Sequence, residues 1–438
     1  MLQSVGNILK IEDLRKKIFF TFAILIVYRI GTHVPLPGVD ARALGEFFRE
    51  ALQGTTFGLF DIFVGGALSR AAIFGVGIMP YISASIILQL LTTTVPYLER
   101  LQKEGEHGRR KINQYTRYLT ILVAAVQAFG VSVFLQGLAA PRTGAPVVPN
   151  PGPTFIFVTV ISLVAGSIFL MWLGEQITER GIGNGISIII FAGTLDSVPN
   201  ELLTTMRLLR TGAITIITLL IVVALMLAVT GAVVAVTEAQ RRLPVQYAKR
   251  IVGRRIYGGQ STYLPLTVNT AGVIPIIFAQ AIMMFPNTVT TFVKTSWAET
   301  FTQWFSPGTL VYDILYGGLI IFFAYFYTSV VMNPRDLADN LQRYSGFIPG
   351  VRPGPKTAEY IDRVLTRILL PGAVFFALIA ILPWYMMKWA HIPFYFGGTR
   401  LLIIVGVALE LMQQVEAHLI MRQYEGLLKK GKIRGWRG

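Results

Sequence analysis

The segment 58–91 constrains the fold most, because it is strongly apolar but too long and too irregular to cross a membrane as one helix. About 20 consecutive apolar residues are enough to span a bilayer. This run is much longer, and it also contains Asp61, the pair Gly65-Gly66, Arg70 and Pro80. A single membrane-spanning helix is therefore excluded for this segment.

We divide the run into a short apolar half-helix, 58–69, and a complete span over about 72–94. Irregular backbone is tolerated at membrane depth only where protein or water surrounds it, because lipid satisfies neither N–H nor C=O groups. The half-helix is accordingly predicted to sit inside a protein cavity, like a stopper. An amphipathic segment lying on the membrane surface is the alternative that composition leaves open.

The composition identifies the class of protein. Of the 438 residues, 53% are hydrophobic and only 14% are charged, whereas about a quarter of the residues in a soluble domain are charged. The chain is therefore predicted to be a polytopic, all-α membrane protein. Its net charge of +16 suits basic cytoplasmic loops and acidic or phosphate-rich partners.

Apolar windows predict about ten membrane spans. Their approximate ranges are 18–34, 72–94, 118–138, 154–173, 183–198, 214–236, 271–289, 311–331, 365–386 and 401–419. Pro80 and Pro275 are predicted to interrupt the second and the seventh span, and three glycines crowd the start of the short fifth span.

Loop charge predicts the orientation. Most of the 39 Lys and Arg residues lie in segments at alternate ends of the spans: 10–17, 100–117, 180, 241–255, 335–367 and 422–437. The positive-inside rule places these segments and both termini in the cytoplasm. Two of the basic loops, 237–268 and 332–364, are long and contain aromatic residues and turn signals, so we expect structured protrusions that dock a partner.

A weak internal sequence repeat indicates two related halves, 1–200 and 201–438. The second span contains Gly77-Ile-Met-Pro-Tyr-Ile and the seventh contains Gly272-Val-Ile-Pro-Ile-Ile. Five spans in each half would give the halves opposite topologies, as in inverted repeats.

No catalytic constellation appears in the sequence. There is no cysteine, the four histidines are scattered, and no phosphate-binding loop or nucleophile elbow is present. We therefore expect no enzyme activity, no metal and no cofactor. Arg29, Asp196 and Glu410 lie in or near spans, where an ionisable residue marks a transport site by default, but a structural partner or an interfacial group is the favoured interpretation.

Eight segments in order along nearly the whole chain carry a family resemblance. GGALSRAAIFGVGIMPYISASIILQLL (65–91) resembles the second span of the SecY family, the central subunit of the protein-conducting channel, in its bacterial branch. Similar matches lie at 28–40, 103–118, 172–193, 247–269, 333–342, 349–357 and 393–403.

The resemblance implies a channel in two halves, which passes unfolded preproteins across the bacterial plasma membrane and releases apolar segments sideways into the lipid bilayer. It also implies a heterotrimer with SecE and SecG, and contacts with the SecA motor, the ribosome and preprotein signal sequences.

Isoleucines separated by four residues occur in two predicted spans. Taken alone, such pairs usually face lipid or pack between helices. The resemblance assigns six isoleucines to an apolar ring that closes the pore: Ile78, Ile82, Ile186, Ile190, Ile277 and Ile403. A narrow apolar ring dewets and blocks ions.

Three further sets of residues follow from the resemblance. The plug below the ring comprises Gly58, Leu59, Phe60, Asp61, Ile62, Phe63, Val64, Gly65, Gly66, Ala67, Leu68 and Ser69. The lateral gate involves Ser83, Gln127 and Phe285. Contacts with SecA or the ribosome involve Arg254, Arg255 and Arg352, whose guanidinium groups suit phosphates and carboxylates.

Two other classes of protein compete with this interpretation. A secondary transporter shares inverted repeats and broken helices, but it predicts a polar site at the middle of the membrane, where this sequence is apolar. An intramembrane enzyme lacks support because no catalytic pair is found.

Overall fold

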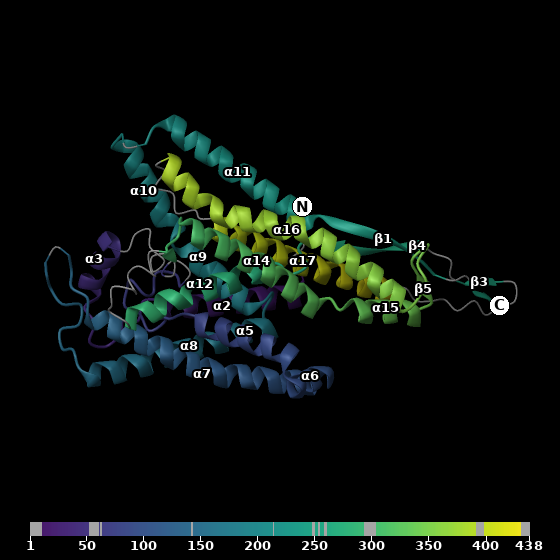
Figure 1. Ribbon diagram of the computed structural model, residues 1–438, viewed down its shortest axis with the longest axis horizontal. Helices are drawn as coiled ribbons and strands as arrows, with labels where there is room; N and C mark the ends of the chain where they lie inside the picture. The colour runs from purple at the N-terminus through teal and green to yellow at the C-terminus, as the bar shows by residue number, and fades with distance from the viewer. Residues whose placement is uncertain are drawn as a thin grey trace. The chain divides into compact units, whose positions relative to one another are not determined.

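The computed structural model describes residues 11–51, 61, 64–141, 143–212, 214–247, 250–252, 255–257, 261–292, 304–390 and 398–430. Over these residues the protein is mostly helical, with two small β-sheets (Figure 1). Seven of the described helices are long and apolar enough to cross a membrane, or eight if one bent pair counts as a span. The chain is thus a polytopic membrane protein.

The chain forms two compact units. Unit 1 comprises Met1–Leu202, Met284–Gln303 and Val407–Gly438, and unit 2 comprises Leu203–Met283 and Trp304–Gly406. The first boundary lies two residues beyond the predicted division at 200, but two segments of the predicted second half, Met284–Gln303 and Val407–Gly438, group with unit 1. The prediction of two related halves remains a prediction.

The N-terminal segment of unit 1 contains helices α2 (Glu12–Gly31), α3 (Ala41–Ala51), α5 (Met79–Thr94), α6 (Pro96–Lys103), α7 (Glu106–Gln136), α8 (Pro153–Arg180) and α9 (Gly185–Asp196), and α10 (Val198–Arg210) follows. Helices α5, α7 and α8 pack side by side. A cluster of Leu36, Val76, Ala128 and Leu163 ties the turn after α2 to α7 and α8.

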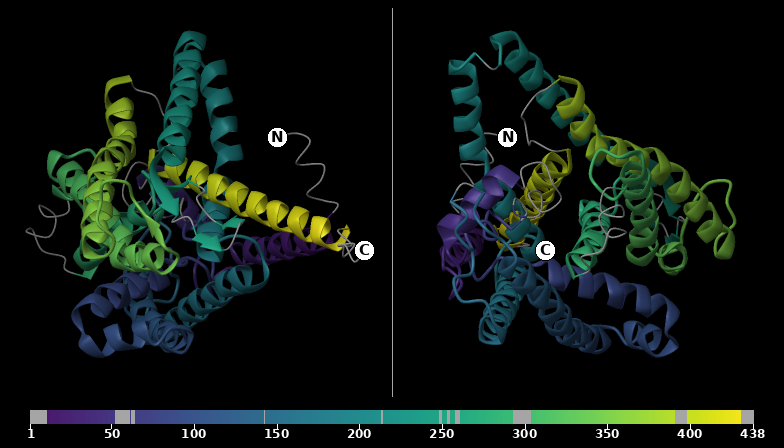
Figure 2. Two further views of the ribbon diagram at one scale, coloured as in Figure 1. Left: turned by 90° about the vertical axis from the view of Figure 1, so that its right-hand side faces the viewer. Right: turned by 60° about the vertical axis from the view of Figure 1, so that its left-hand side comes forward.

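Helix α6 turns by 97° from α5 and lies across the start of α7 (Figure 2). Pro96 is the first residue of α6, and a proline restricts the residue before it to extended backbone. Val95 accordingly has φ −97° and ψ 113°. The bend lies at the predicted end of the second span, residue 94, just before the basic segment 100–117.

The second span is shorter than the sequence predicts. Residues 64–78 form successive turns, and α5 begins at Met79 rather than near residue 72. The prediction of a half-helix up to Ser69 is therefore wrong for residues 64–69. Gly65 and Gly66, with φ 70° and 71°, adopt left-handed backbone that a helix excludes and that glycine accepts at little cost.

Pro80 does not interrupt the second span, and Pro275 does not interrupt the seventh. Each is the second residue of its helix, α5 or α12 (Ile274–Phe292). Proline is favoured in the first helical turn, because the N–H groups there have no partner within the helix.

The glycine-rich start of the fifth span is a close packing contact between α8 and α9. A Cβ at Gly185 would collide with the carbonyl group of Gly174 on α8. Asn184 caps α9, and its Oδ1 accepts from the amides of Ile186 at 3.1 Å and Ser187 at 3.3 Å. Asparagine is among the preferred capping residues, so the sequence sets this helix start locally.

The later helices are α11 (Ile216–Glu238), α12, α14 (Leu310–Val331), α15 (Pro334–Arg343), α16 (Pro355–Ala390) and α17 (Gly398–Lys430). Helices α14 and α16 pack through Ala324, Leu369 and Ala373. Small residues at this contact let two membrane helices approach closely.

The two long basic loops form one structured element, although the predicted fold was all-α. Strands β1 (Gln240–Tyr247) and β4 (Ser261–Thr267) make an antiparallel hairpin, and β5 (Gly346–Phe347) from the second loop pairs with β1. A second small sheet joins β2 (Arg250–Val252) to β3 (Arg255–Tyr257).

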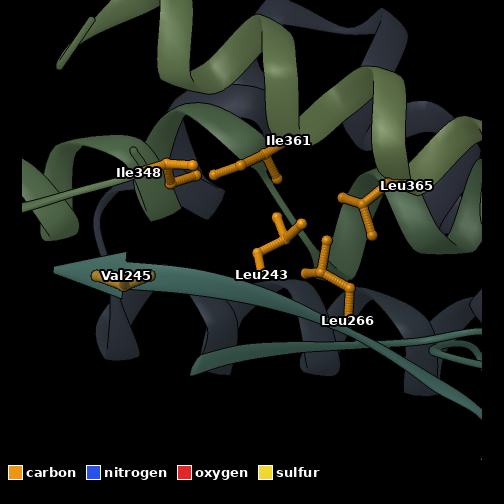
Figure 3. Close-up of a cluster of buried hydrophobic side chains, with 6 residues drawn as sticks. All are labelled: Leu243, Val245, Leu266, Ile348, Ile361 and Leu365. Atoms are coloured by element: carbon orange, nitrogen blue, oxygen red, sulfur yellow. The ribbon is translucent and has the colours of Figure 1, made fainter. Parts of the chain in front are cut away.

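A hydrophobic cluster fastens this sheet to α16. Its buried members come from β1, β4, the turn after β5 and α16 (Figure 3): Leu243, Val245, Leu266, Ile348, Ile361 and Leu365. The prediction that both loops are structured is confirmed for their described residues.

Candidate functional site

The 64–72 loop, which contains the described end of the predicted plug, is bound to the rest of unit 1 by backbone contacts. The hydroxyl of Tyr28 donates to the carbonyl of Val64 at 3.2 Å. The amide of Leu36 donates to the carbonyl of Ala71 at 2.6 Å. These contacts hold both ends of the loop against α2 and the turn that follows it.

The loop is also closed on itself. Oδ1 of Asp61 accepts from the amide of Ser69 at 2.9 Å, and the Ser69 hydroxyl donates to the carbonyl of Gly66 at 3.1 Å. The predicted plug residues Gly58, Leu59, Phe60, Ile62 and Phe63 lie outside the described residues.

One carboxylate binds two arginines beside this loop. Asp196, the last residue of α9, forms ion pairs with Arg29 of α2 and, at 3.2 Å, with Arg70 of the loop. Arg70 also donates to the carbonyl of Gly65 at 2.9 Å. Structural roles for Arg29 and Asp196 are confirmed. Arg70, the second partner of Asp196, was missed, because nothing in local sequence connects these two residues.

Within unit 1 the predicted ring residues sit on two helices. Ile78 and Ile82 are buried at the start of α5, and Ile190 is buried on α9. Ile186 is half-buried, and its side chain lies against Gly174 of α8.

Within unit 2 the remaining two isoleucines are buried on neighbouring elements. Ile277 lies in the first turn of α12 and Ile403 lies in α17. A Cβ at Gly406 would collide with Val273, the residue before α12. Ile403 and Gly406 are three residues apart on α17 and so share a face, which brings Ile403 toward the start of α12.

Two of the predicted gate residues are half-buried on packed helices, Ser83 on α5 and Gln127 on α7. Phe285 belongs to α12, but its side chain lies outside the described residues.

The three predicted docking arginines differ in how far the structure describes them. Arg352 is exposed in the turn between β5 and α16, and its carbonyl accepts from the Thr357 hydroxyl at 3.0 Å. Arg255 is the first residue of β3, opposite Val252. Arg254 lies outside the described residues.

A polar network inside unit 2 was not predicted from the sequence. The Tyr385 hydroxyl of α16 donates to Oδ2 of the buried Asp313 on α14 at 2.8 Å. Tyr316 of α14 and Thr399 of α17 share a hydrogen bond of 3.1 Å. Polar groups within apolar helices were the available signal, since such groups bond across helices.

The model of one protein family, SecY, matches residues 72–412 of this chain. The chain belongs to the SecY family. The protein translocase subunit SecY of Aquifex aeolicus is 47% identical over 431 residues, covering 98% of this chain and 100% of that protein. The subunit of Escherichia coli K12 is 49% identical over 428 residues, covering 97% and 96% of the two chains.

Solved structures agree on the fold. A structure described as that of a protein conducting channel has a TM-score of 0.62, 17% identity and 92% coverage of both chains. A structure from a study of the SecY plug domain and its stabilisation of the closed channel has a TM-score of 0.63, 18% identity and the same coverage. Sec61 in a canine ribosome–channel complex gives a TM-score of 0.58 at 16% identity.

Family membership establishes the class of function. This protein is a protein-conducting channel subunit of the Sec translocase, so it is a transporter and not an enzyme. The competing interpretation as a secondary transporter is therefore rejected.

Proposed function

We propose that this SecY subunit passes unfolded preproteins through a pore that residues 58–69 plug and six isoleucines constrict. The observation that carries the proposal is the 64–72 loop, which is irregular, docked by its backbone and rich in buried side chains. Irregular backbone of this kind fits a protein-lined cavity and is unsuited to lipid.

Matching helix starts support the proposal of two related halves. Gly77 and Gly272, three residues before Pro80 and Pro275, have φ values of 64° and 62°. The carbonyl of Ile78 accepts from residues 81 and 82, and that of Val273 accepts from residues 276 and 277. The same backbone geometry thus recurs where Ile82 and Ile277 enter the proposed ring.

In the proposed cycle, Ser83, Gln127 and Phe285 border a lateral gate. A nascent segment leaves through this gate when its transfer into lipid is favourable. Leucine at the centre of a segment favours lipid by a few tenths of a kcal/mol, whereas aspartate or lysine opposes it by about 3 kcal/mol. An apolar wall sorts segments on this difference without recognising their sequence.

The proposed partners are SecE and SecG in a heterotrimer, the SecA motor, the ribosome, signal sequences and the lipid bilayer. One structural neighbour is Sec61 in a canine ribosome–channel complex, and another is a yeast Ssh1 complex bound to the 80S ribosome. Each of the two long loops carries a predicted docking arginine: Arg255 on β3 and the exposed Arg352. Guanidinium groups suit ribosomal phosphates or SecA carboxylates.

We place the protein in the bacterial plasma membrane with both termini and the β1–β4 hairpin in the cytoplasm. The basic loop segments support this orientation through the positive-inside rule. The relatives named above are bacterial.

Reconstitution tests the transport function. Vesicles containing this chain with SecE and SecG should import a signal-bearing preprotein when SecA and ATP are added. The same preprotein without its signal sequence, or the mixture without ATP, should stay outside. Equal import of both preproteins would contradict the proposal.

Deletion of residues 58–69 tests the plug. The channel that lacks residues 58–69 should conduct ions at rest in planar bilayers, whereas the parent channel should stay closed. Both channels should still translocate preproteins. An unchanged resting conductance would show that this segment is not the seal.

A further inference from the structure

We propose that Arg70 and Asp196 form a latch that holds the 64–72 loop in its docked position and must open before the loop can leave. This inference rests on the proposed plug role of the segment. It assigns a positioning function to two charged residues that the ring, the gate and the docking surfaces do not use.

The position of Asp196 is unfavourable unless it is paired. Its side chain is only 13% exposed, and a charge withdrawn from water is strongly disfavoured without a partner. Two arginines, Arg29 and Arg70, offset this cost.

The two arginines belong to different parts of unit 1. Arg29 belongs to α2 and is 46% exposed. Arg70 belongs to the loop, is 32% exposed, and binds both Asp196 and the loop carbonyl of Gly65. Arg29 therefore stays with the scaffold, whereas Arg70 must leave Asp196 if the loop moves away.

The surface of α9 is shaped to receive the loop beside this ion pair. Gly193 lies one turn before Asp196 and so shares its face. A Cβ at Gly65 would be 3.3 Å from the Cα of Gly193. The loop backbone can approach α9 this closely because neither residue has a side chain, and this places Arg70 within reach of Asp196.

A single cysteine provides a direct readout of loop position, because the chain contains no cysteine. Val64 is 3% exposed and packs on Gly77, whose added Cβ would be 3.0 Å from Val64 Cγ2. Val64→Cys should therefore react slowly with a water-soluble maleimide in the reconstituted channel. A thiol that labels as fast as in the detergent-denatured protein would overturn the proposal, since the loop would not be docked.

Adding Arg70→Gln to Val64→Cys should raise the labelling rate about tenfold. Asp196→Asn should raise it further, because it leaves Arg29 and Arg70 facing each other. Arg29→Gln should stay within about threefold of the parent, since the Arg70–Asp196 pair remains. Arg70→Lys keeps the charge and should restore part of the protection.

Arg42→Gln, an exposed arginine on α3, is the matched control and should leave the labelling rate unchanged. Equal rates for Arg70→Gln and the parent would overturn the latch, as would an equal rise in the Arg42→Gln control. If Asp196→Asn does not fold, the Arg70 variants still decide, because replacing Arg70 leaves Asp196 paired with Arg29.

The labelling assay separates the latch from the plug role. It reports where the loop lies, whether or not the loop seals the pore. Faster labelling in Arg70→Gln combined with an unchanged conductance after deletion of 58–69 would keep the latch and reject the plug. Unchanged labelling in Arg70→Gln combined with a raised conductance after deletion of 58–69 would reject the latch and keep the plug.

Discussion

The amide of Ile82 donates to the carbonyl of Ile78 over 3.2 Å, which places these two isoleucines one turn apart at the start of α5. Ile277 has the same bond to Val273, also 3.2 Å, at the start of α12. Ile82 of unit 1 and Ile277 of unit 2 therefore sit at a helix start, just after an irregular segment with a left-handed glycine.

We predict that changing several ring isoleucines to serine wets the pore. Each truncation removes apolar packing of the closed state worth roughly 1 kcal/mol or more. Resting ion leak should increase, and export of a preprotein with a defective signal sequence should rise. Conductance and export assays measure these effects.

Ile188→Ser is a suitable control for the ring, because Ile188 is buried on α9 but lies outside the proposed set. A channel with several of these serine substitutions that shows no ion leak and keeps its signal selectivity would show that the isoleucines are ordinary packing residues.

We predict that Ser83→Cys combined with Phe285→Cys forms a disulfide that arrests transport. A lateral gate closed by a covalent bond cannot release a segment, and reduction should restore export. Non-reducing electrophoresis and preprotein import follow the two effects. Ser85→Cys with Phe285→Cys is the control, because Ser85 lies two residues further on α5 and points to another face. Equal crosslinking of both pairs would refute the assignment of Ser83.

We predict that Arg352→Glu weakens SecA-driven export by at least about tenfold, because it places a carboxylate opposite the carboxylates of SecA at the proposed docking contact. Ribosome binding should also fall steeply with added salt. The turn should survive, since the Arg352 backbone carbonyl, and not its side chain, holds Thr357. Arg343→Glu, on the exposed end of α15, is the control. Normal export by Arg352→Glu would remove this residue from the docking site.

We predict that Leu243→Ala loosens the loop sheet by about 2–5 kcal/mol, because Leu243 is 2% exposed within the cluster that joins β1 to Ile348 and α16. Hydrogen exchange of the β1 and β4 amides should accelerate. Tyr263→Ala, at an exposed position on β4, should change this exchange little. Unchanged exchange in Leu243→Ala would mean that the cluster does not hold the sheet.

The amino-acid sequence by itself determined the membrane class, the approximate spans and the local signals at helix starts. These properties depend on neighbouring residues: apolar windows set transfer into lipid, Asn184 caps the helix that follows it, and proline is accepted in a first helical turn. The family resemblance rested on motifs of the same local kind.

Only the tertiary structure decided which distant groups meet. Arg70 and Asp196 are 126 residues apart, and the pairing of Gln246 with Phe347 joins the two long loops. No periodicity encodes such contacts, because they depend on how the chain returns through space. The irregular backbone of 64–78 was missed for a related reason: its apolar composition also suits a helix, and docking against α2 and α9 favours the turns instead.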